Sequence, residues 1–254
     1  MKASTSIAAL LLDIEGTTTP IDFVFKVLFP YARAHVRDYL AAHLWSLEVR
    51  ADIAGLLEEN AQDTRAASAS TSVEGPRPPL IEGPAELVSL EEVTAYVHWL
   101  MDRDRKSTPL KSIQGKIWEA GYHSGELTSL VFEDVPRAFE RWREQGRSIH
   151  IYSSGSVLAQ KLLFAGTQLG DLTPFIGRYF DTHMGAKKEA ESYRRIAAAL
   201  ELKPAEVLFV SDVTDELEAA ESAALQTLLC VRPGNHPQAR AASYKAIQSF
   251  DEIA

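Results

Sequence analysis

Apolar runs alternate with helical patterns at both ends of the chain. Residues 7–12 form a continuous apolar run, which predicts a strand covered on both faces, and this run ends at the polar sequence DIEGTTTP. A helix is expected at 135–145, with Gly146 as its C-terminal cap, and a strand at 148–152 leads into SSGS. Each of these strands therefore ends at a polar segment.

The same alternation continues toward the C-terminus. The pattern predicts, in order, a strand at 178–181, a helix at 189–200, a strand at 207–210, a helix at 215–224 and a strand at 227–231. Repeated strand–helix units of this length favour an α/β fold with a doubly wound parallel sheet.

Between the two ends, residues 22–132 have almost no strand signal and read as an all-helical insert. Amphipathic stretches at 25–40 and 47–57 predict helices, and Ser89 with Glu92 predicts a capping box at the start of another. Small residues, glycine and prolines predict a flexible loop near 66–84. We therefore expect a core made of 1–21 and 133–254, interrupted by the insert at 22–132.

Composition narrows the class of protein. A chain of 254 residues with 46% hydrophobic content can bury a core without disulfides. The net charge of -9 disfavours nucleic acid and anionic membranes as general partners. The single cysteine, Cys230, lies in an apolar run and is expected in a core strand. The apolar run at 7–12 is too short to span a membrane, so a cytoplasmic protein is expected.

Polar side chains follow the predicted strands. Asp13 and Glu15 follow the first strand, Ser153 and Ser154 the second, and Asp212 the strand at 207–210, while Lys187 and Lys188 precede a helix. In an open parallel sheet, ligands bind at the carboxyl ends of the strands. A single acidic residue there could merely cap the next helix. Carboxylates, paired serines and a lysine in this order instead indicate one shared site.

These residue types suit phosphoryl transfer. The Asp13 carboxylate can attack phosphorus directly, and Mg²⁺ held by Asp13, Asp212, a backbone carbonyl and waters would reduce the repulsion between the two anions. Glu15 is placed to protonate the leaving oxygen and later to activate water. Ser153 and Ser154 could bind the other phosphate oxygens. Glu216 could hold the metal ligands in place without contacting the ion itself, although its place in a first helical turn also suits simple capping.

In the order Asp13, Ser153, Lys187 and Asp212, these positions resemble the four motifs of the haloacid dehalogenase superfamily, whose phosphatases use an aspartate nucleophile. Phosphatases of that superfamily usually carry Asp at the second acidic position, where this chain has Glu15. Together with IYSSGSVLAQKLLF, GAKKEAESYRRIA, FVSDVT and VRPGN, this departure resembles the enolase-phosphatase family of methionine salvage.

The resemblance implies a bifunctional enzyme that enolises and then dephosphorylates 2,3-diketo-5-methylthiopentyl 1-phosphate, with one Mg²⁺ per subunit. It implies metal binding by Asp13, Asp212 and the Glu15 backbone carbonyl, and substrate contacts from Ser153, Ser154 and Lys187. Lys187 is chosen over Lys188 because Gly185 and Glu189 frame it as the family pattern requires. The resemblance also implies a monomer and makes the helical insert a cap that limits access to the site.

Several alternatives remain open at this point. The base for enolisation is not evident: His98, His123 and Lys116 are candidates, but a structural role is the commoner one for such residues. Trp99 and Trp118 are expected in the core of the insert. The competing functions are an ordinary Mg²⁺-dependent phosphatase acting on another small metabolite, a metal-free dehalogenase, and a non-enzymatic receiver-like module on the same sheet.

Overall fold

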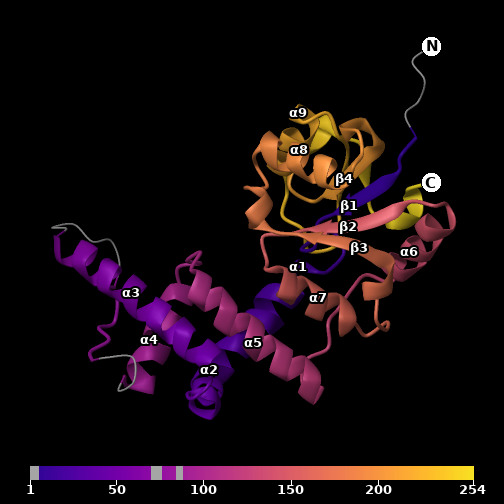
Figure 1. Ribbon diagram of the computed structural model, residues 1–254. Coiled ribbons are helices and arrows are strands. Elements are labelled where there is room, and N and C mark those ends of the chain that lie inside the picture. The colour runs from indigo at the N-terminus through magenta and orange to yellow at the C-terminus, as the bar shows by residue number, and fades with distance from the viewer. Residues whose placement is uncertain (1–5, 70–75, 84–87) are drawn as a thin grey trace. The chain divides into compact units, whose positions relative to one another are not determined.

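A computed structural model describes residues 6–69, 76–83 and 88–254. The chain divides into two compact units (Figure 1). The core unit consists of residues 6–27 together with Ser124–Ala254, and the helical unit is Leu28–His123. These bounds come from the structure itself; the assignment of the helical unit as a cap stays a prediction.

A six-stranded parallel sheet forms the centre of the core unit, in the order β3-β2-β1-β4-β5-β6. The strands are β1 Ala9–Leu12, β2 Ser148–Tyr152, β3 Ile176–Phe180, β4 Val207–Ser211, β5 Gln226–Cys230 and β6 Ala246–Ile247. Every side chain of β1 is buried, as its continuous apolar pattern predicts. The expected doubly wound α/β fold is confirmed, and β6 is an addition that is too short to leave a sequence signal.

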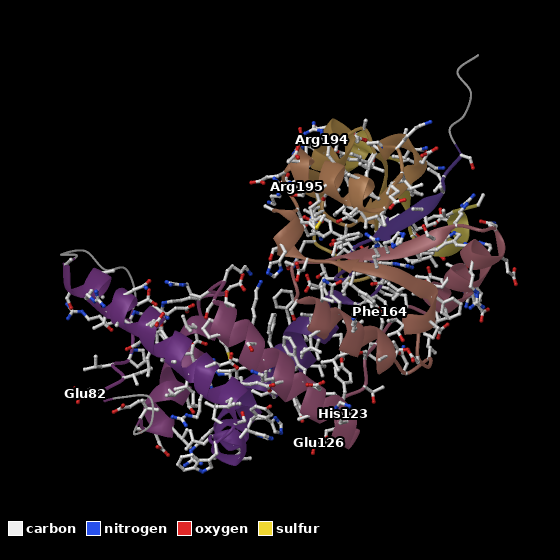
Figure 2. The ribbon with its side chains drawn as sticks, in the orientation of Figure 1. Glu82, His123, Glu126, Phe164, Arg194 and Arg195 are labelled. Carbon is white, nitrogen blue, oxygen red and sulfur yellow. The ribbon has the colours of Figure 1, made fainter. Side chains whose placement is uncertain are left out.

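Helices cover both faces of this sheet (Figure 1). They are α6 Asp134–Glu144, α7 Val157–Ala165, α8 Ala190–Ala199 and α9 Thr214–Ser222, joined by short 3₁₀ turns at Thr173–Phe175, Thr182–Met184, Pro204–Glu206, Ala241–Ser243 and Phe250–Glu252. Helix α8 buries Tyr193 and Ile196 against the sheet and exposes Arg194 and Arg195 (Figure 2). Such a helix follows from an apolar stripe of period 3.6.

Turn chemistry explains two helix ends. Gly146 lies at φ +73°, the left-handed conformation expected of a C-terminal cap, two residues before β2 begins. At the start of α4 (Leu90–Met101), the Ser89 hydroxyl accepts a hydrogen bond from the Glu92 N–H, as the sequence predicts. The Glu92 carboxylate does not complete the expected capping box, because it accepts from the Glu82 N–H at 3.2 Å.

The helical unit has a hydrophobic core of its own. It contains α2 Phe29–His43, α3 Leu47–Ala69, α4 and most of α5 Thr108–Ser124; α1 Ile21–Phe23 and the five-residue π-helix Val24–Leu28 lead into it. Its core includes Val36, Leu56, Val97 and Ile113, all fully buried. A unit of this kind can hold its shape by helix packing alone.

The predicted loop near 66–84 is partly wrong. Helix α3 continues through 66–69, because alanine favours helix more than other residues do and outweighs the loop signal there. Residues 70–75 and 84–87 lie outside the described residues, and 76–83 contain no helix or strand. Within the described chain, every helix is too short or too polar to cross a membrane.

Candidate active site

Asp13 and Asp212 lie at the carboxyl edge of the sheet, directly after the central strands β1 and β4. The Asp13 N–H continues the strand pairing by donating to the Val210 carbonyl at 3.0 Å. Both side chains are almost fully buried. Because parallel strands end at the same edge, residues 199 positions apart in number can face one small volume.

Lys187 joins two of the carboxylates. Its Nζ lies 2.5 Å from Asp13 Oδ1 and 2.7 Å from Glu216 Oε2. Burial lowers the pKa of Lys187, but the attraction of Asp13 and Glu216 outweighs burial and raises this pKa above its usual value. The lysine is therefore a permanent positive charge against Asp13.

The backbone around Lys187 is held by buried aromatic residues. The Tyr193 hydroxyl donates to the Lys187 carbonyl at 2.7 Å, and the Tyr152 hydroxyl donates to the Gly185 carbonyl at 2.9 Å. Both rings belong to the core beneath the site. The position of the ammonium group is thus fixed from the protein interior.

Ser211, the last residue of β4, lies between Asp13 and Glu216. Its Oγ is 3.2 Å from Asp13 Oδ2 and 2.9 Å from Glu216 Oε2, so its single proton can be shared between two acceptors. The Val213 N–H donates to the same Oγ at 3.1 Å. This hydroxyl fixes the spacing of the two carboxylates.

The site carries an excess of negative charge. Burial, with the nearby charges of Asp13 and Glu216, raises the pKa of Asp212 to about 7. Burial, opposed by the attraction of Lys187 and aided by Asp13, raises the pKa of Glu216 to about 7. Lys187 pairs with Asp13 and Glu216, and Asp212 adds a third carboxylate that feels the charges of both, a charge balance that suits a bound cation.

The donor set fits a hard divalent cation. Among the described residues, no group of three or more His, Cys, Asp and Glu side chains is arranged to hold a metal. The predicted ligand set does not need three such side chains, since it consists of the Asp13 and Asp212 side chains with a backbone carbonyl and waters. Oxygen ligands of this kind suit Mg²⁺, which keeps several of its waters in proteins.

The remaining predicted residues occupy the turns beside this cluster. Glu15 is half-buried in the turn after β1, where its backbone forms a bridge with Thr19. Ser153 is buried at the end of β2 and accepts from the Gly155 N–H at 3.1 Å, while Ser154 is exposed. These turns follow neighbouring strands at the edge of the sheet that carries Asp13.

The two adjacent lysines have different surroundings. Lys187 keeps only 10% of its side chain exposed, whereas Lys188 keeps 66% and pairs with Asp215 at 2.9 Å. The structure thus brings Lys187, and not Lys188, to Asp13. Lys188 has the surroundings of a surface charge.

The candidate bases for enolisation have local partners inside the helical unit. Lys116 Nζ lies 2.5 Å from Asp52 Oδ2, and the rings of His98 and His123 lie 3.0 and 2.9 Å from backbone carbonyl oxygens. Trp99 and Trp118 donate to backbone carbonyls and pack against the core of this unit. Each of these contacts suits a structural role.

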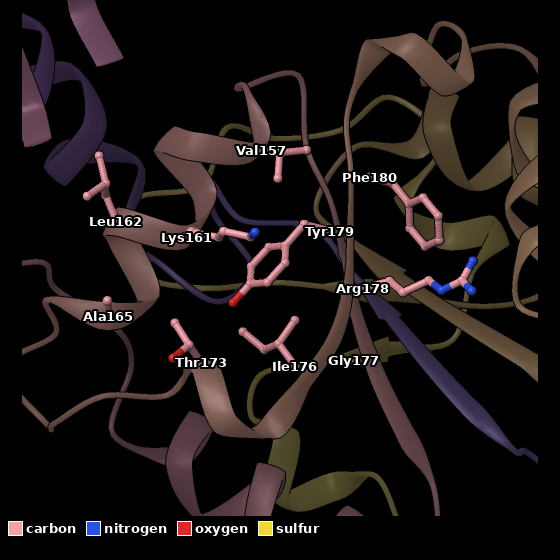
Figure 3. Close-up of a pocket in the computed structure, with 10 residues that line it drawn as sticks. All are labelled: Val157, Lys161, Leu162, Ala165, Thr173, Ile176, Gly177, Arg178, Tyr179 and Phe180. Carbon is pink, nitrogen blue, oxygen red and sulfur yellow. The ribbon is translucent and has the colours of Figure 1, made fainter. Parts of the chain in front are cut away.

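Two features at other places do not belong to the cluster. Cys230 is buried in β5, as its apolar neighbours predict. A shallow pocket of about 770 Å³ lies between α7 and the edge strand β3, with Lys161 and Tyr179 among its lining residues (Figure 3). None of the predicted site residues lines this pocket.

Sequence reasoning missed two residues of the site. Ser211 is the last residue of the apolar strand β4. Its role at the site is visible only in its contacts with Asp13 and Glu216. Asn235 follows β5, and its Nδ2 donates to the Gly16 carbonyl at 2.9 Å. Asn235 could have been found by applying to β5 the rule that was used for the other strands, namely that polar residues after parallel strands gather at one edge of the sheet.

Comparison with known proteins agrees with this architecture. A family model for haloacid dehalogenase-like hydrolases matches residues 7–224. Enolase-phosphatase E1 of Synechococcus elongatus is 50% identical over 253 residues, covering 100% of both chains. Enolase-phosphatase E1 of Drosophila pseudoobscura pseudoobscura is 45% identical over 228 residues, covering 90% of this chain and 86% of its own.

A solved structure is also similar along the whole chain. The UTR4 protein of Saccharomyces cerevisiae has a TM-score of 0.76 and 32% sequence identity, covering 97% of this chain and 100% of its own. A full-length match at 50% identity, on the fold and the charged cluster described above, confirms the resemblance inferred from the motifs. The chain therefore belongs to the haloacid dehalogenase-like hydrolases and, within them, to the enolase-phosphatase family.

Proposed function

We propose that this enzyme converts 2,3-diketo-5-methylthiopentyl 1-phosphate, by enolisation and then dephosphorylation, into 1,2-dihydroxy-3-keto-5-methylthiopentene, the acireductone of methionine salvage. The relationship to enolase-phosphatases over the full chain supports the substrate. The observation that carries the chemistry is the buried Asp13 carboxylate, held 2.5 Å from the Lys187 ammonium group. A small phosphate ester is the substrate class that such a carboxylate can attack.

The proposed nucleophile is Asp13. Its Oδ1 accepts from the Ile14 N–H at 2.8 Å as well as from Lys187, so the carboxylate is held in one orientation before substrate arrives. Attack on phosphorus forms an aspartyl phosphate and releases the substrate oxygen, and water then cleaves the acyl phosphate. Glu15, in the same turn, is the proposed acid for the first step and base for the second.

The remaining roles concern negative charge. Asp13 and Asp212, with the Glu15 carbonyl, are the proposed ligands of one Mg²⁺, which supplies charge neutralisation at the phosphoryl group when it is bound. Lys187 provides positive charge from the protein itself. Ser153, Ser154 and Lys187 are proposed to bind the phosphate oxygens, because all three lie on turns or loops near the carboxyl edge of the sheet.

The test is to incubate the enzyme and Mg²⁺ with the diketone phosphate, measuring phosphate release and the absorbance of the enol together. We expect both signals from the natural enzyme and no phosphate release from Asp13→Asn. Asp251→Asn is the matched control, since Asp251 pairs only with arginines at the surface and should leave both signals unchanged. Phosphate release without an enol signal would contradict the bifunctional reaction and leave an ordinary phosphatase.

A further inference from the structure

Asn235 lies in the turn that follows β5 and reaches back to the turn after β1. Its backbone N–H donates to the Arg232 carbonyl at 3.1 Å. Its side-chain Nδ2 donates to the Gly16 carbonyl at 2.9 Å and to the Cys230 carbonyl at 3.2 Å. Asn235 thus ties the turn after β1, at Gly16, to the end of β5 at Cys230.

These two hydrogen bonds fix the orientation of the amide group. Both partners are carbonyl oxygens, which only accept, so the NH₂ group of Asn235 must face them. Its Oδ1 must then point away from Gly16 O and Cys230 O. This oxygen is buried, and no group of the described chain donates a hydrogen bond to it.

The Asn235 oxygen shares a small space with the Asp212 carboxylate. A Cβ atom placed on Gly16 would lie 2.5 Å from Asp212 Oδ2 and 2.8 Å from Asn235 Oδ1. Gly16 has φ +71°, and the Asp212 and Asn235 oxygens pack so closely against it that no other side chain fits at this position. Two buried acceptors that face one space are unfavourable unless a hydrogen donor or a cation joins them.

We propose that Asn235 is a positioning residue of the metal site, whose Oδ1 accepts a hydrogen bond from a water bound to Mg²⁺ beside Asp212. This inference rests on the proposed Mg²⁺ site. Magnesium retains bound waters in proteins, and groups that accept from those waters help to hold the ion. Through its hydrogen bond to Gly16, Asn235 would also hold the Glu15 backbone carbonyl at the correct distance from the proposed Mg²⁺.

Two variants separate this role from a purely structural one. Asn235→Ala removes the oxygen and the NH₂ group, whereas Asn235→Asp keeps an oxygen at the same position and replaces the NH₂ group with a second, negatively charged carboxylate oxygen. By calorimetric titration of metal-stripped protein, we expect Asn235→Ala to bind Mg²⁺ about 10-fold or more weakly. We expect Asn235→Asp to recover most of that loss.

A purely structural role predicts that Asn235→Asp gives no recovery of Mg²⁺ affinity. If Asn235 only held Gly16 through Nδ2, both variants would lose Mg²⁺ affinity to the same extent, or Asp would be the worse because its carboxylate would face two carbonyls. Gln238→Ala is the matched control: it removes another amide of the same loop, one that accepts from the Thr214 N–H, and should leave the Mg²⁺ affinity unchanged.

The outcomes are distinguishable. If the natural protein does not bind Mg²⁺, the proposed metal site and this inference both fail. If the natural protein binds Mg²⁺ and Asn235→Ala binds it equally well, or if Asn235→Asp is no better than Asn235→Ala, the role of Asn235 is wrong while the proposed function stands. The thermal shift of each metal-stripped variant on addition of Mg²⁺ gives an independent readout of the same affinity.

Discussion

At the scale of single residues, Lys187 and Lys188 show how a shift of one position changes chemistry. Lys187 is buried against Asp13 and Glu216, and Lys188 is exposed beside Asp215. Removal of Lys187 leaves two buried carboxylates without their counter-charge, whereas an exposed pair such as Lys188–Asp215 contributes little.

We therefore expect Lys187→Ala to lower kcat/KM for phosphate release by at least about 100-fold, since it removes a charge that faces the reacting group. Lys188→Ala, its matched control, should stay within about twofold of the natural enzyme. Steady-state kinetics at saturating Mg²⁺ measures both variants. Equal losses at the two positions would mean that the contact between Lys187 and Asp13 is not the one used in the reaction.

The raised pKa of Asp212 predicts how pH affects the stability of the metal-free protein. The folded pKa of about 7 lies above the usual value of 3.8, so the folded state holds a proton that the unfolded chain has already released. The contribution of Asp212 to the free energy of unfolding must then fall as pH rises between these two values. It is lowest above about pH 7, where the buried carboxylate is charged.

The difference in unfolding free energy between the natural protein and Asp212→Asn should therefore change with pH. Urea unfolding without metal, from about pH 5 to pH 8, should show the natural protein losing stability relative to the variant by on the order of a few kcal/mol. Added Mg²⁺ should remove most of this dependence, because it neutralises the carboxylate. A constant difference across this range would show that the charge on Asp212 is not destabilising.

At the scale of elements, the turn after β1 is held by the segment after β5. The Arg232 Nε donates to the Thr17 carbonyl at 3.2 Å, and Asn235 holds the Gly16 carbonyl. Arg232 is itself buried and paired with Asp134 at 2.8 Å, with 4% and 8% of the two side chains exposed. The start of α6 thus supports the turn after β1 through a buried ion pair.

Asp134→Ala should be strongly destabilising, because it leaves the Arg232 guanidinium buried without its counter-charge. We expect a loss of about 3–5 kcal/mol in the free energy of unfolding, measured by urea denaturation. The exposed pair of Arg137, on the same helix, with Asp251 in the turn Phe250–Glu252 is a natural control, and Asp251→Ala should cost less than about 1 kcal/mol. Similar costs for the two variants would contradict the importance of burial.

At the scale of the whole molecule, the two units have separate hydrophobic cores. The proposed Mg²⁺ ligands all belong to the core unit. A ligand stabilises the folded state that binds it, and two units with separate cores need not unfold as one. We expect calorimetry to resolve two unfolding transitions. Mg²⁺ should raise the midpoint temperature of the one that belongs to the core unit.

Hydrogen exchange, measured with and without Mg²⁺, would assign each unfolding transition to one of the two units. Strands β1 and β4 should gain protection on Mg²⁺ binding, and α2 and α4 should not, because the latter belong to the helical unit. At a free Mg²⁺ concentration 100 times Kd, the free energy of unfolding of the core unit should increase by about 2.7 kcal/mol. Equal protection of both units would show that they unfold together.

Much of the architecture could be predicted because the signals are local. Continuous apolar runs gave β1, β2 and β4 within a few residues, and helical periodicity gave α6, α8 and α9. Strand β6 was missed because two residues carry no period, and the end of α3 was misplaced because the loop signal of the neighbouring serines and threonines was given more weight than the helix preference of its alanines. The sequence motifs identified the family without any geometry.

The sequence by itself determined the α/β class, the helical insert and the residues at the strand ends, because these depend on neighbours along the chain. Only the tertiary structure decided which residues meet. Asp13 and Lys187 are 174 positions apart, and their contact exists because parallel strands end at one edge of the sheet. The same packing placed Ser211 between two carboxylates and brought the Asn235 and Asp212 oxygens against Gly16, which no spacing in the chain could reveal.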